Sequence, residues 1–218
     1  MFKDIKAQIQ HIKNSDPASR SSLEILLLYP SIHVMIIYRI AQQLHKSGFR
    51  FLARMLSQLG RFLTGIEIHP GAQIGQGLFI DHGSGVIIGE TAILGDNITL
   101  YQGVTLGGTG KETGKRHPTL EDNVMISAGA KIIGSFTIGE NSKVGAGSVV
   151  LKEVPPNCTV VGVPGHIVKQ NNISIPRNDL NQVDLPDPVE VEIQSLVEAN
   201  EHLVKRIAEL EQQLSSKE

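Results

Sequence analysis

A six-residue period runs through the middle of the chain and limits what it can fold into. From residue 65 to 165, aliphatic or small residues recur six apart in two runs, Ile68, Ile74, Ile80, Val86, Ala92, Ile98 and Val104, then Leu120, Ile126, Ile132, Ile138, Val144 and Val150. Three such units make one triangular coil of about 18 residues, and stacked coils bury the aliphatic side chains between them. The period therefore predicts a parallel β-helix over residues 65–165.

The two runs of the repeat are out of phase with each other. Val104 and Leu120 are 16 residues apart, which is not a multiple of six, and the excess lies in the glycine-rich segment 107–117. We expect this segment to leave the coil as an extruded loop. The 22 glycines, 4% aromatic residues and absence of tryptophan agree with a repetitive β architecture of tight turns.

Residues 1–64 have a helical pattern, with apolar residues at spacings of three and four. Ser15 or Asp16 before Pro17 resembles a helix start, and we expect Pro30 and residues 46–48 to separate further helices. The apolar stretch 23–40 contains charged residues and a proline, which favours a buried helix pair over a membrane span.

The C-terminal part of the chain changes character twice. Residues 166–187 are polar and contain two prolines, which predicts a linker. Residues 188–218 carry two apolar heptad series, Ile193, Asn200, Ile207 and Leu214 with Val189, Leu196, Leu203 and Leu210. They predict a C-terminal coiled-coil helix, and an amphipathic helix folded onto the domain is the alternative. The expected fold class is α+β, with helical, β-helix, linker and coiled-coil segments in that order.

Composition excludes several classes of partner and site. The formal net charge of -2 and the pI of about 6.4 give no reason to expect a nucleic acid or an anionic membrane as partner. The single cysteine, Cys158, excludes an intrachain disulfide framework and a cysteine-based zinc cluster. The N-terminal residues lack the pattern of a secretory signal, so we expect a cytoplasmic protein.

Several short motifs carry a resemblance to a known family. They are Glu-Ile-His-Pro at 67–70, Asp-His-Gly at 81–83, Gly-Gly-Thr-Gly-Lys at 107–111 and Arg-His-Pro at 116–118. Together they resemble the serine acetyltransferase family, from Asp16 to about Val168. The hexapeptide repeat alone is shared by many acyltransferases, so the Asp-His-Gly element and the loop motif carry the specificity.

The resemblance implies a fold and a reaction. The fold is a left-handed parallel β-helix. The reaction moves the acetyl group of acetyl-CoA to the hydroxyl of L-serine, giving O-acetyl-L-serine and CoA in the first step of cysteine biosynthesis. A serine hydroxyl needs a base at neutral pH, and histidine suits this role. The resemblance assigns the base to His82, oriented by residue 67, where the family usually has Asp and this chain has Glu67. The alternatives are a structural histidine at a corner and a solvated Glu67.

The resemblance also implies a serine-binding set. Asp16 and Asp81 match positions that hold the substrate amino group, Arg116 matches the residue that binds the carboxylate, and His117 lines the same pocket. Asp16 as a helix cap is an alternative of even weight. Arg116 and His117 as solvated loop residues are the alternative for the other half of the set.

For the cofactor arm, the resemblance points to small residues that leave room for a thin pantetheine chain: Gly108, Thr109, Ala128 and Ala146. The Gly110-Lys111 pair is followed by Glu112, so it does not form a phosphate-binding P-loop. The family commonly has Ala-Arg after Gly-Val-Pro, whereas this chain has Gly165-His166, so we expect weaker contact with the CoA phosphates.

Three other functions remain open from the sequence. A zinc lyase of the γ-carbonic anhydrase type needs two histidines five residues apart, and no such pair is present. An acetyltransferase acting on a sugar and a non-catalytic scaffold are the other two. We expect acetyl-CoA as the co-substrate and no metal.

Expectations about assembly come from the same resemblance. We expect a homotrimer rather than a hexamer, because only 15 residues precede Asp16, where larger family members have a longer helical domain. Many relatives end in an isoleucine that inserts into O-acetylserine sulfhydrylase. This chain ends in Lys217-Glu218, so we expect no tail-mediated complex.

Overall fold

The computed structural model of the chain describes residues 2–110, 113–170 and six residues between 196 and 206. The chain divides into two compact units, Met1–Leu185 and Pro186–Glu218. In the second unit the described residues are helical: Leu196, Val197, Asn200, Leu203, Val204 and Arg206. Most of the predicted coiled coil, and residues 171–187 of the predicted linker, lie outside the described residues.

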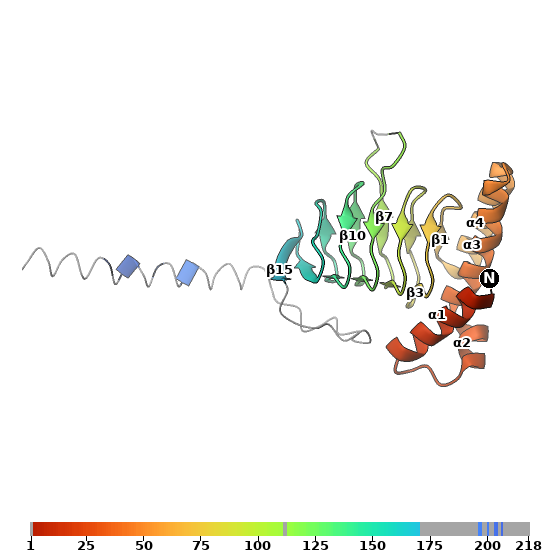
Figure 1. The fold of residues 1–218 in the computed structure, drawn as a ribbon, viewed down its shortest axis with the longest axis horizontal. Helices are drawn as coiled ribbons and strands as arrows, with labels where there is room; N and C mark the ends of the chain where they lie inside the picture. The colour runs from red at the N-terminus through yellow and green to blue at the C-terminus, as the bar shows by residue number, and fades with distance from the viewer. Residues whose placement is uncertain are drawn as a thin grey trace, which may run out of the picture. The chain divides into compact units, whose positions relative to one another are not determined.

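The first unit begins with four helices, α1 (Phe2–Ser15), α2 (Ser22–Leu28), α3 (Pro30–Lys46) and α4 (Arg50–Thr64) (Figure 1). Pro30 opens α3 and residues 47–49 separate α3 from α4, as expected. The helix start predicted at Ser15–Pro17 is wrong, because α1 ends at Ser15 and α2 begins after Ser21, whose hydroxyl accepts a hydrogen bond from the Glu24 N–H. The side chain of Asp16 instead accepts the N–H of Ala18 at 2.8 Å, which closes a tight turn.

The helices are followed by thirteen short strands that form three parallel sheets. Sheet A has the order β1-β4-β7-β10-β13, sheet B β11-β8-β5-β2, and sheet C contains β12-β9-β6-β3. The bounds are β1 Glu67–Ile68, β2 Gln73–Ile74, β3 Phe79–Ile80, β4 Ile87–Ile88, β5 Ile93–Leu94, β6 Thr99–Leu100, β7 Thr105–Gly107, β8 Thr119–Leu120, β9 Met125–Ile126, β10 Lys131–Ile133, β11 Thr137–Ile138, β12 Lys143–Val144 and β13 Val149–Val150. Successive strands enter sheets A, B and C in turn, which fits the left-handed parallel β-helix expected from the sequence.

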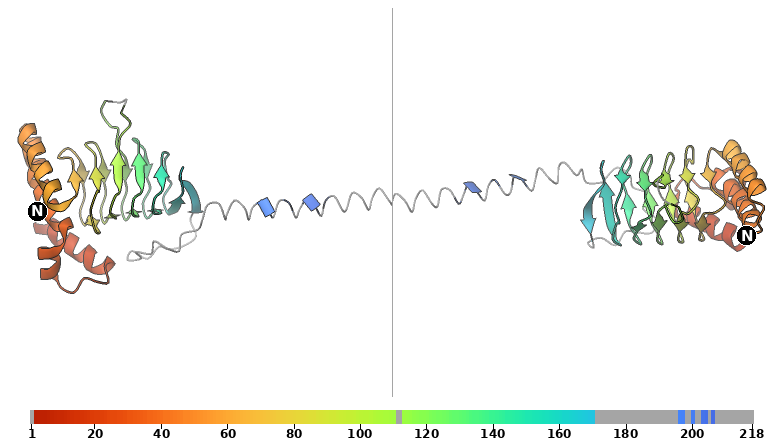
Figure 2. Two further views of the ribbon diagram at one scale, coloured as in Figure 1. Left: turned by 180° about the vertical axis from the view of Figure 1, so that it is seen from behind. Right: turned by 90° about the horizontal axis from the view of Figure 1, so that it is seen from above.

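The predicted repeat gives the core of this β-helix. All thirteen positions of the two runs are buried, with at most 7% of any of these residues exposed. Nine of them lie in strands and stack from coil to coil in register, for example Ile132 on Val150. The predicted phase is wrong for the other four, Val86, Ala92, Ile98 and Val104, which lie in the corners just before β4 to β7. The stacked strand positions there come two residues later, at Ile88, Leu94, Leu100 and Leu106, because the corner before β4 is two residues longer than the next corners of its kind. The segment between β7 and β8 leaves the coil as the predicted loop (Figures 1 and 2).

Two further strands close the far end of sheet C. β14 (Cys158–Val161) pairs parallel with β12 and antiparallel with β15 (His166–Gln170). The sequence assigns residues 166–170 to the linker, but their backbone pairs with β14 and continues the sheet. A polar pattern with no six-residue period does not reveal such an added antiparallel strand.

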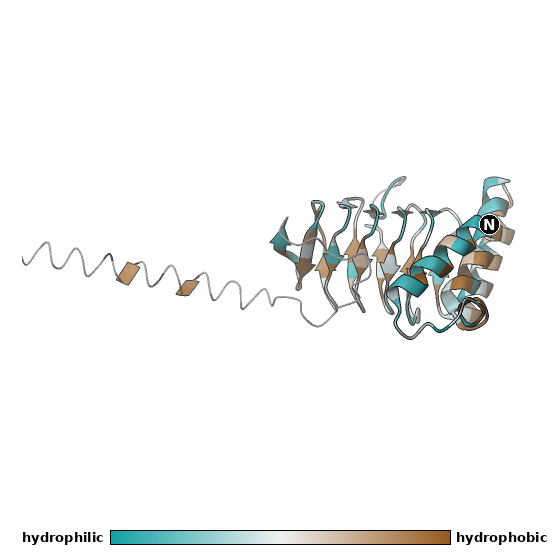
Figure 3. Cartoon of the chain, turned by 60° about the horizontal axis from the view of Figure 1, so that its bottom comes forward, coloured by the Kyte–Doolittle hydropathy of each residue, from teal (hydrophilic) through white to brown (hydrophobic). Residues whose placement is uncertain are grey.

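The helices are fastened to the first coil by hydrogen bonds to its backbone carbonyls. Tyr38 of α3 donates its hydroxyl to the Ala72 carbonyl at 2.6 Å, and Ser57 of α4 donates to the Ile68 carbonyl at 2.7 Å. Hydrophobic and polar residues alternate along the helices (Figure 3). No single helix in the described part of the chain is long and apolar enough to cross a membrane, although α2 and α3, bent by 65° at their junction, reach that length and composition when taken together.

Candidate active site

The predicted base, His82, lies in an unusually long corner of the β-helix. We call the connections from sheet C to sheet A the CA corners. Six residues, 81–86, separate β3 from β4, whereas four residues, 101–104 and 127–130, form the next two CA corners. The extra length pushes the turn outward, and 74% of the His82 side chain is exposed. Sequence analysis missed this lengthening because the buried Val86 keeps the six-residue spacing, whereas the inward strand residues Ile80 and Ile88 are eight residues apart.

The backbone at His82 is unusual for a residue with a side chain. Its φ is 57°, in the left-handed region, and Gly83 follows at 56°. Two tight backbone hydrogen bonds fix the turn, from the Gly83 N–H to the Asp81 carbonyl and from the Ser84 N–H to the His82 carbonyl, both at 2.7 Å. The imidazole is therefore presented to solvent from a constrained backbone.

Two carboxylates lie beside this turn. Burial raises the pKa of Asp81 above its ordinary value, the charge of His82 opposes this shift, and the carboxylate of Asp16 reinforces it. The hydroxyl of Tyr29 donates to Asp16 Oδ2 at 2.6 Å. Asp16 and Asp81 thus act on each other electrostatically although they are 65 residues apart in sequence. A cation between them relieves their mutual repulsion.

Glu67 is the first residue of β1 and lies at the same edge of sheet A as His82. Its neighbour Ile66 packs directly under the His82 turn, because a Cβ added to Gly83 would lie 2.6 Å from Ile66 Cδ1. The Glu67 carboxylate accepts from Arg54 at 2.8 Å and from Arg61 at 2.9 Å. Sequence analysis did not identify these two arginines.

Arg116 and His117 lie at the other end of the sheet A strands. We call the connections from sheet A to sheet B the AB corners, and the extruded loop 108–118 is one of them. Arg116 forms a 2.7 Å ion pair with Glu90 of the preceding AB corner. The hydroxyl oxygen of Thr91 accepts the N–H groups of Arg116 and His117 at 3.0 and 3.1 Å, which fixes the end of the loop.

The ring of His117 is buried and has a defined orientation. Its Nδ1 accepts the N–H of Thr91 at 3.2 Å, so the neutral ring carries its proton on Nε2. Burial, together with the positive charges of Arg116 and Lys115, lowers the pKa of His117, while Glu90 opposes the shift. The ring lies on the backbone of Gly89, where a Cβ would be 1.9 Å from its Cδ2. His117 is therefore a neutral group that offers an Nε2–H donor.

The residues expected to line CoA divide between the same two corners. Ala128 and Ala146 occupy equivalent positions in successive CA corners, in one column with Ser84 and Gln102. Each corner is joined to the next by a 2.8 Å backbone hydrogen bond, for example from the Gly147 N–H to the Ala128 carbonyl. Gly108 and Thr109 begin the extruded loop, and Gly108 lies against Arg116, since a Cβ there would be 2.9 Å from Arg116 Cγ. Ala128 and Ala146 thus lie in the same column of corners as the His82 corner, and Gly108 and Thr109 lie in the loop that bears Arg116.

The predicted site residues therefore form two groups at opposite ends of sheet A. The first contains Asp16, Glu67, Asp81, His82, Ala128 and Ala146, and the second contains Gly108, Thr109, Arg116 and His117. Among the described residues, no three His, Cys, Asp or Glu side chains are arranged to hold a metal ion.

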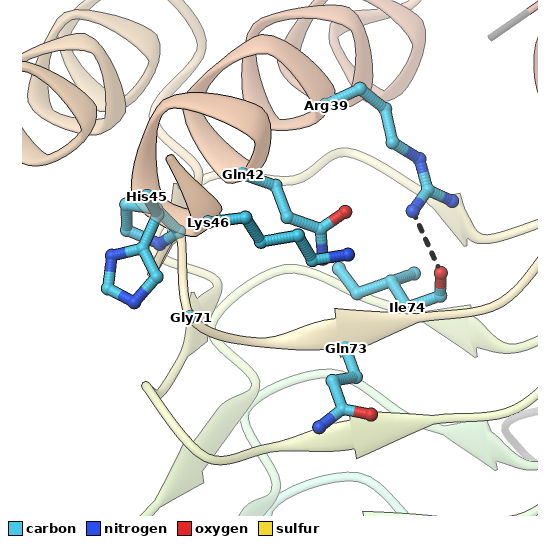
Figure 4. A pocket seen from close by; sticks show the side chains of 8 residues that line it. Arg39, Gln42, His45, Lys46, Gly71, Gln73 and Ile74 are labelled. Carbon is cyan, nitrogen blue, oxygen red and sulfur yellow. Dashed lines mark hydrogen bonds between the residues drawn. The ribbon is translucent and has the colours of Figure 1, made fainter. Parts of the chain in front are cut away.

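A cavity of ≈ 470 Å³ lies between α3 and the first coil. Figure 4 shows Lys46 and Gln42 reaching over β2 beside Arg39, which donates to the Ile74 carbonyl at 2.9 Å. Its lining residues are Arg39, Gln42, His45, Lys46, Pro70, Gly71, Gln73 and Ile74. None of the predicted site residues lines this cavity.

Sequence analysis missed the residues that hold the predicted ones. Glu90 and Thr91 lie within the stretch from Asp16 to about Val168 that resembles the family, so their position was a usable signal. Tyr29 had no such signal, because its contact with Asp16 depends on how the segment between α1 and α3 folds back.

Comparison with known proteins identifies the family. Residues 117–152 match the family described as bacterial transferase hexapeptide (six repeats). The serine acetyltransferase of Bacillus subtilis (strain 168) is 54% identical over 210 residues, which make up 96% of this chain and 95% of that protein.

Solved structures give the same result. Neisseria gonorrhoeae serine acetyltransferase in complex with serine has a TM-score of 0.74 and 44% identity, over 77% of this chain and 69% of that one. Brucella abortus strain S19 serine acetyltransferase in complex with coenzyme A has a TM-score of 0.77 and 41% identity, over 79% of this chain and 69% of that one. The identity to the Bacillus protein extends over nearly the full length of both sequences, and the chain belongs to the serine acetyltransferase family.

Proposed function

We propose that this chain is a serine O-acetyltransferase that moves the acetyl group of acetyl-CoA to the hydroxyl of L-serine, with His82 as the general base. The observation that carries this proposal is the lengthened, constrained corner that exposes His82 beside Asp81 and Asp16. The serine complex of the Neisseria relative and the coenzyme A complex of the Brucella relative support the choice of substrates.

In the proposed reaction, His82 takes the proton of the serine hydroxyl as the hydroxyl oxygen attacks the thioester carbonyl carbon. The tetrahedral intermediate collapses with cleavage of the carbon–sulfur bond. The leaving CoA sulfur takes the proton from the His82 imidazolium, which leaves O-acetyl-L-serine, CoA and the neutral base. Glu67, next to the His82 turn, orients the imidazole in this scheme.

The two ends of serine bind at different groups. The paired carboxylates of Asp16 and Asp81 hold the ammonium, which relieves the repulsion that raises the pKa of Asp81. The planar guanidinium of Arg116 binds the carboxylate. Glu90 holds Arg116 at 2.7 Å before substrate binds, and the neutral His117 lines the pocket beside it.

A site of this composition needs two copies of the chain. In one chain the His82 corner and the Arg116 loop lie at opposite ends of sheet A, so a single serine cannot touch both. If the CA corner of one copy faces the AB corner of the next, the serine set and the CoA set (Gly108 and Thr109 opposite Ala128 and Ala146) are completed together. Three copies close such an arrangement as a homotrimer.

Exposed apolar side chains on α4 support self-association. Phe51 and Phe62 are 80% and 85% exposed, and Met55 between them is 57% exposed. The heptads of residues 188–218 form a parallel three-helix coil in this proposal, since chains already held together raise the effective concentration of the helices. The remaining proposals are a cytoplasmic location, no metal, nucleic acid or membrane partner, and no tail-mediated complex with O-acetylserine sulfhydrylase.

A thiol-release assay with acetyl-CoA and a panel of hydroxyl acceptors tests the function. We expect release of CoA with L-serine and a much weaker signal with sugars or threonine. Preference for a sugar would identify another acetyltransferase, and no release with any acceptor would favour a scaffold. Activity that is lost on treatment with a chelator and restored by zinc would contradict the metal-free mechanism.

A further inference from the structure

Two arginines of α4 form ion pairs with the carboxylate of Glu67. Arg54 Nη2 lies 2.8 Å from Glu67 Oε1, and Arg61 Nη1 lies 2.9 Å from Oε2, so each oxygen has its own guanidinium. The Glu67 side chain is 15% exposed, whereas the arginines are 43% and 56% exposed. The carboxylate is thus held at the protein surface between α4 and β1, at the edge of sheet A that bears the His82 turn.

The helix presents both arginines to the same point. Arg54 and Arg61 are seven residues apart, or about two turns, so they share one face of α4. Between them, Ser57 donates to the carbonyl of Ile68, the residue after Glu67, at 2.7 Å. Gly65, in the left-handed conformation with a φ of 73°, ends α4 two residues before Glu67. The arginines and the carboxylate therefore belong to one rigid junction.

A glutamate at this position needs contacts that fix its carboxylate more than an aspartate does. The family usually has Asp at the position of Glu67. The additional methylene gives Glu one more rotatable bond, so its carboxylate samples more positions unless contacts select one. Two charge-assisted hydrogen bonds, one on each oxygen, select one. The second lone pair on each oxygen remains available for another donor.

We propose that Arg54 and Arg61 are positioning residues for acetyl transfer, which fix the longer Glu67 side chain in the one conformation that orients His82. The proposal rests on the proposed function, in which Glu67 orients the base. It assigns to this chain a compensating pair for the departure from Asp, carried on the helix that precedes the β-helix.

The test compares Arg54→Gln, Arg61→Gln and the double variant with the unchanged protein in steady-state acetyl transfer. We expect the double variant to lose about 10- to 100-fold in kcat, because a misplaced group far from the reacting atoms has effects of this size. The KM values for serine and acetyl-CoA change little, since neither arginine touches a substrate. Arg50→Gln on the same helix is the matched control and keeps its activity, because Arg50 lies outside the Glu67 ion pairs.

Rescue separates positioning from a structural role. Glu67→Asp introduced into the double variant should recover most of the lost kcat, measured relative to Glu67→Asp alone, because the shorter side chain has fewer conformations to restrict. A loss that Glu67→Asp does not rescue would mean that the arginines only support α4, and full activity of the double variant would also overturn the proposal. If the double variant does not fold, as judged by circular dichroism, Arg61→Gln alone decides by the same comparison.

Failure of the positioning proposal is distinguishable from failure of the proposed function. If Glu67→Gln lowers kcat while both arginine variants do not, the orienting role of Glu67 stands and the positioning role of the arginines falls. If Glu67→Gln and His82→Ala both keep full activity, the proposed mechanism itself falls.

Discussion

The hydroxyl of Tyr29 donates a 2.6 Å hydrogen bond to the carboxylate of Asp16. Tyr29 lies between α2 and α3, whereas Asp16 follows α1, so this bond ties the two ends of the intervening segment together. Burial and the bond to Asp16 raise the pKa of Tyr29, so its hydroxyl stays protonated and keeps donating at neutral pH. Asp16 is therefore held in place toward Asp81 before any substrate arrives.

Tyr29→Phe removes this bond and leaves the ring in its apolar contacts. We expect the KM for serine to rise by about 2- to 10-fold, since one hydrogen bond contributes about 0.5–1.5 kcal/mol. The KM for acetyl-CoA should stay constant. Initial-rate measurements with each substrate varied in turn check this, and equal changes in both KM values would contradict a role confined to serine.

His82→Ala tests the base. We expect kcat to fall by on the order of 10² to 10⁴, because the serine hydroxyl loses its proton acceptor. Binding of acetyl-CoA, followed by calorimetry, should persist, which shows that the fold and the cofactor site are intact. Near-normal turnover in a folded variant would assign the base elsewhere.

Arg116→Ala tests the carboxylate contact. The substitution removes the partner of the substrate carboxylate and leaves Glu90 unpaired close by, so the KM for serine should rise much more than that for acetyl-CoA. Glu90→Gln is the companion variant, because it keeps Arg116 but releases its ion pair. A larger effect of Arg116→Ala on acetyl-CoA than on serine would move this residue to the cofactor side.

His11 gives the fold a dependence on pH. This α1 residue lies 3.0 Å from the Thr99 hydroxyl on sheet C, and burial lowers its pKa to about 4 from an ordinary value of 6.5. The folded state disfavours the charged ring, so its contribution is intact above pH 6.5 and is lost as the pH falls from 6.5 toward 4. The free energy of unfolding should decrease by on the order of 2–3 kcal/mol across this window.

Denaturant unfolding at fixed protein concentration, at several pH values, measures this effect. His11→Asn should flatten the dependence between pH 6.5 and 4, whereas the exposed His166→Asn should leave it unchanged. A curve for His11→Asn that follows that of the unchanged protein would show that other groups cause the loss.

Light scattering tests the assembly. We expect a mass of three chains of 23.6 kDa each, because the two halves of the site lie at opposite ends of sheet A in each chain. A mass near six chains would contradict the prediction of a trimer. Deletion of residues 188–218 should weaken association at low protein concentration, and a mass unaffected at every concentration would show that the coil is not required.

The sequence by itself determined the β-helix. Its thirteen spaced positions are all buried, and nine of them lie in short parallel strands whose aliphatic residues point into the coil. The strand phase between residues 86 and 106 was missed, because Val86 and Ile88 are both buried aliphatic residues and only the structure decides which of them lies in the strand. The same periodicity located the extruded loop as a break in phase. The β-helix and its loop can be predicted from the sequence because each coil packs on a similar coil above and below it, so the same short pattern repeats along the chain.

Only the tertiary structure decided how the site is held. The pairing of Glu67 with Arg54 and Arg61 depends on how α4 packs on β1, and the bond from Tyr29 to Asp16 depends on the path of the chain between helices. The division of the site between two corners follows from sheet A, which separates His82 from Arg116. Contacts between segments distant in sequence are set by packing and charge in three dimensions, and no periodic pattern encodes them.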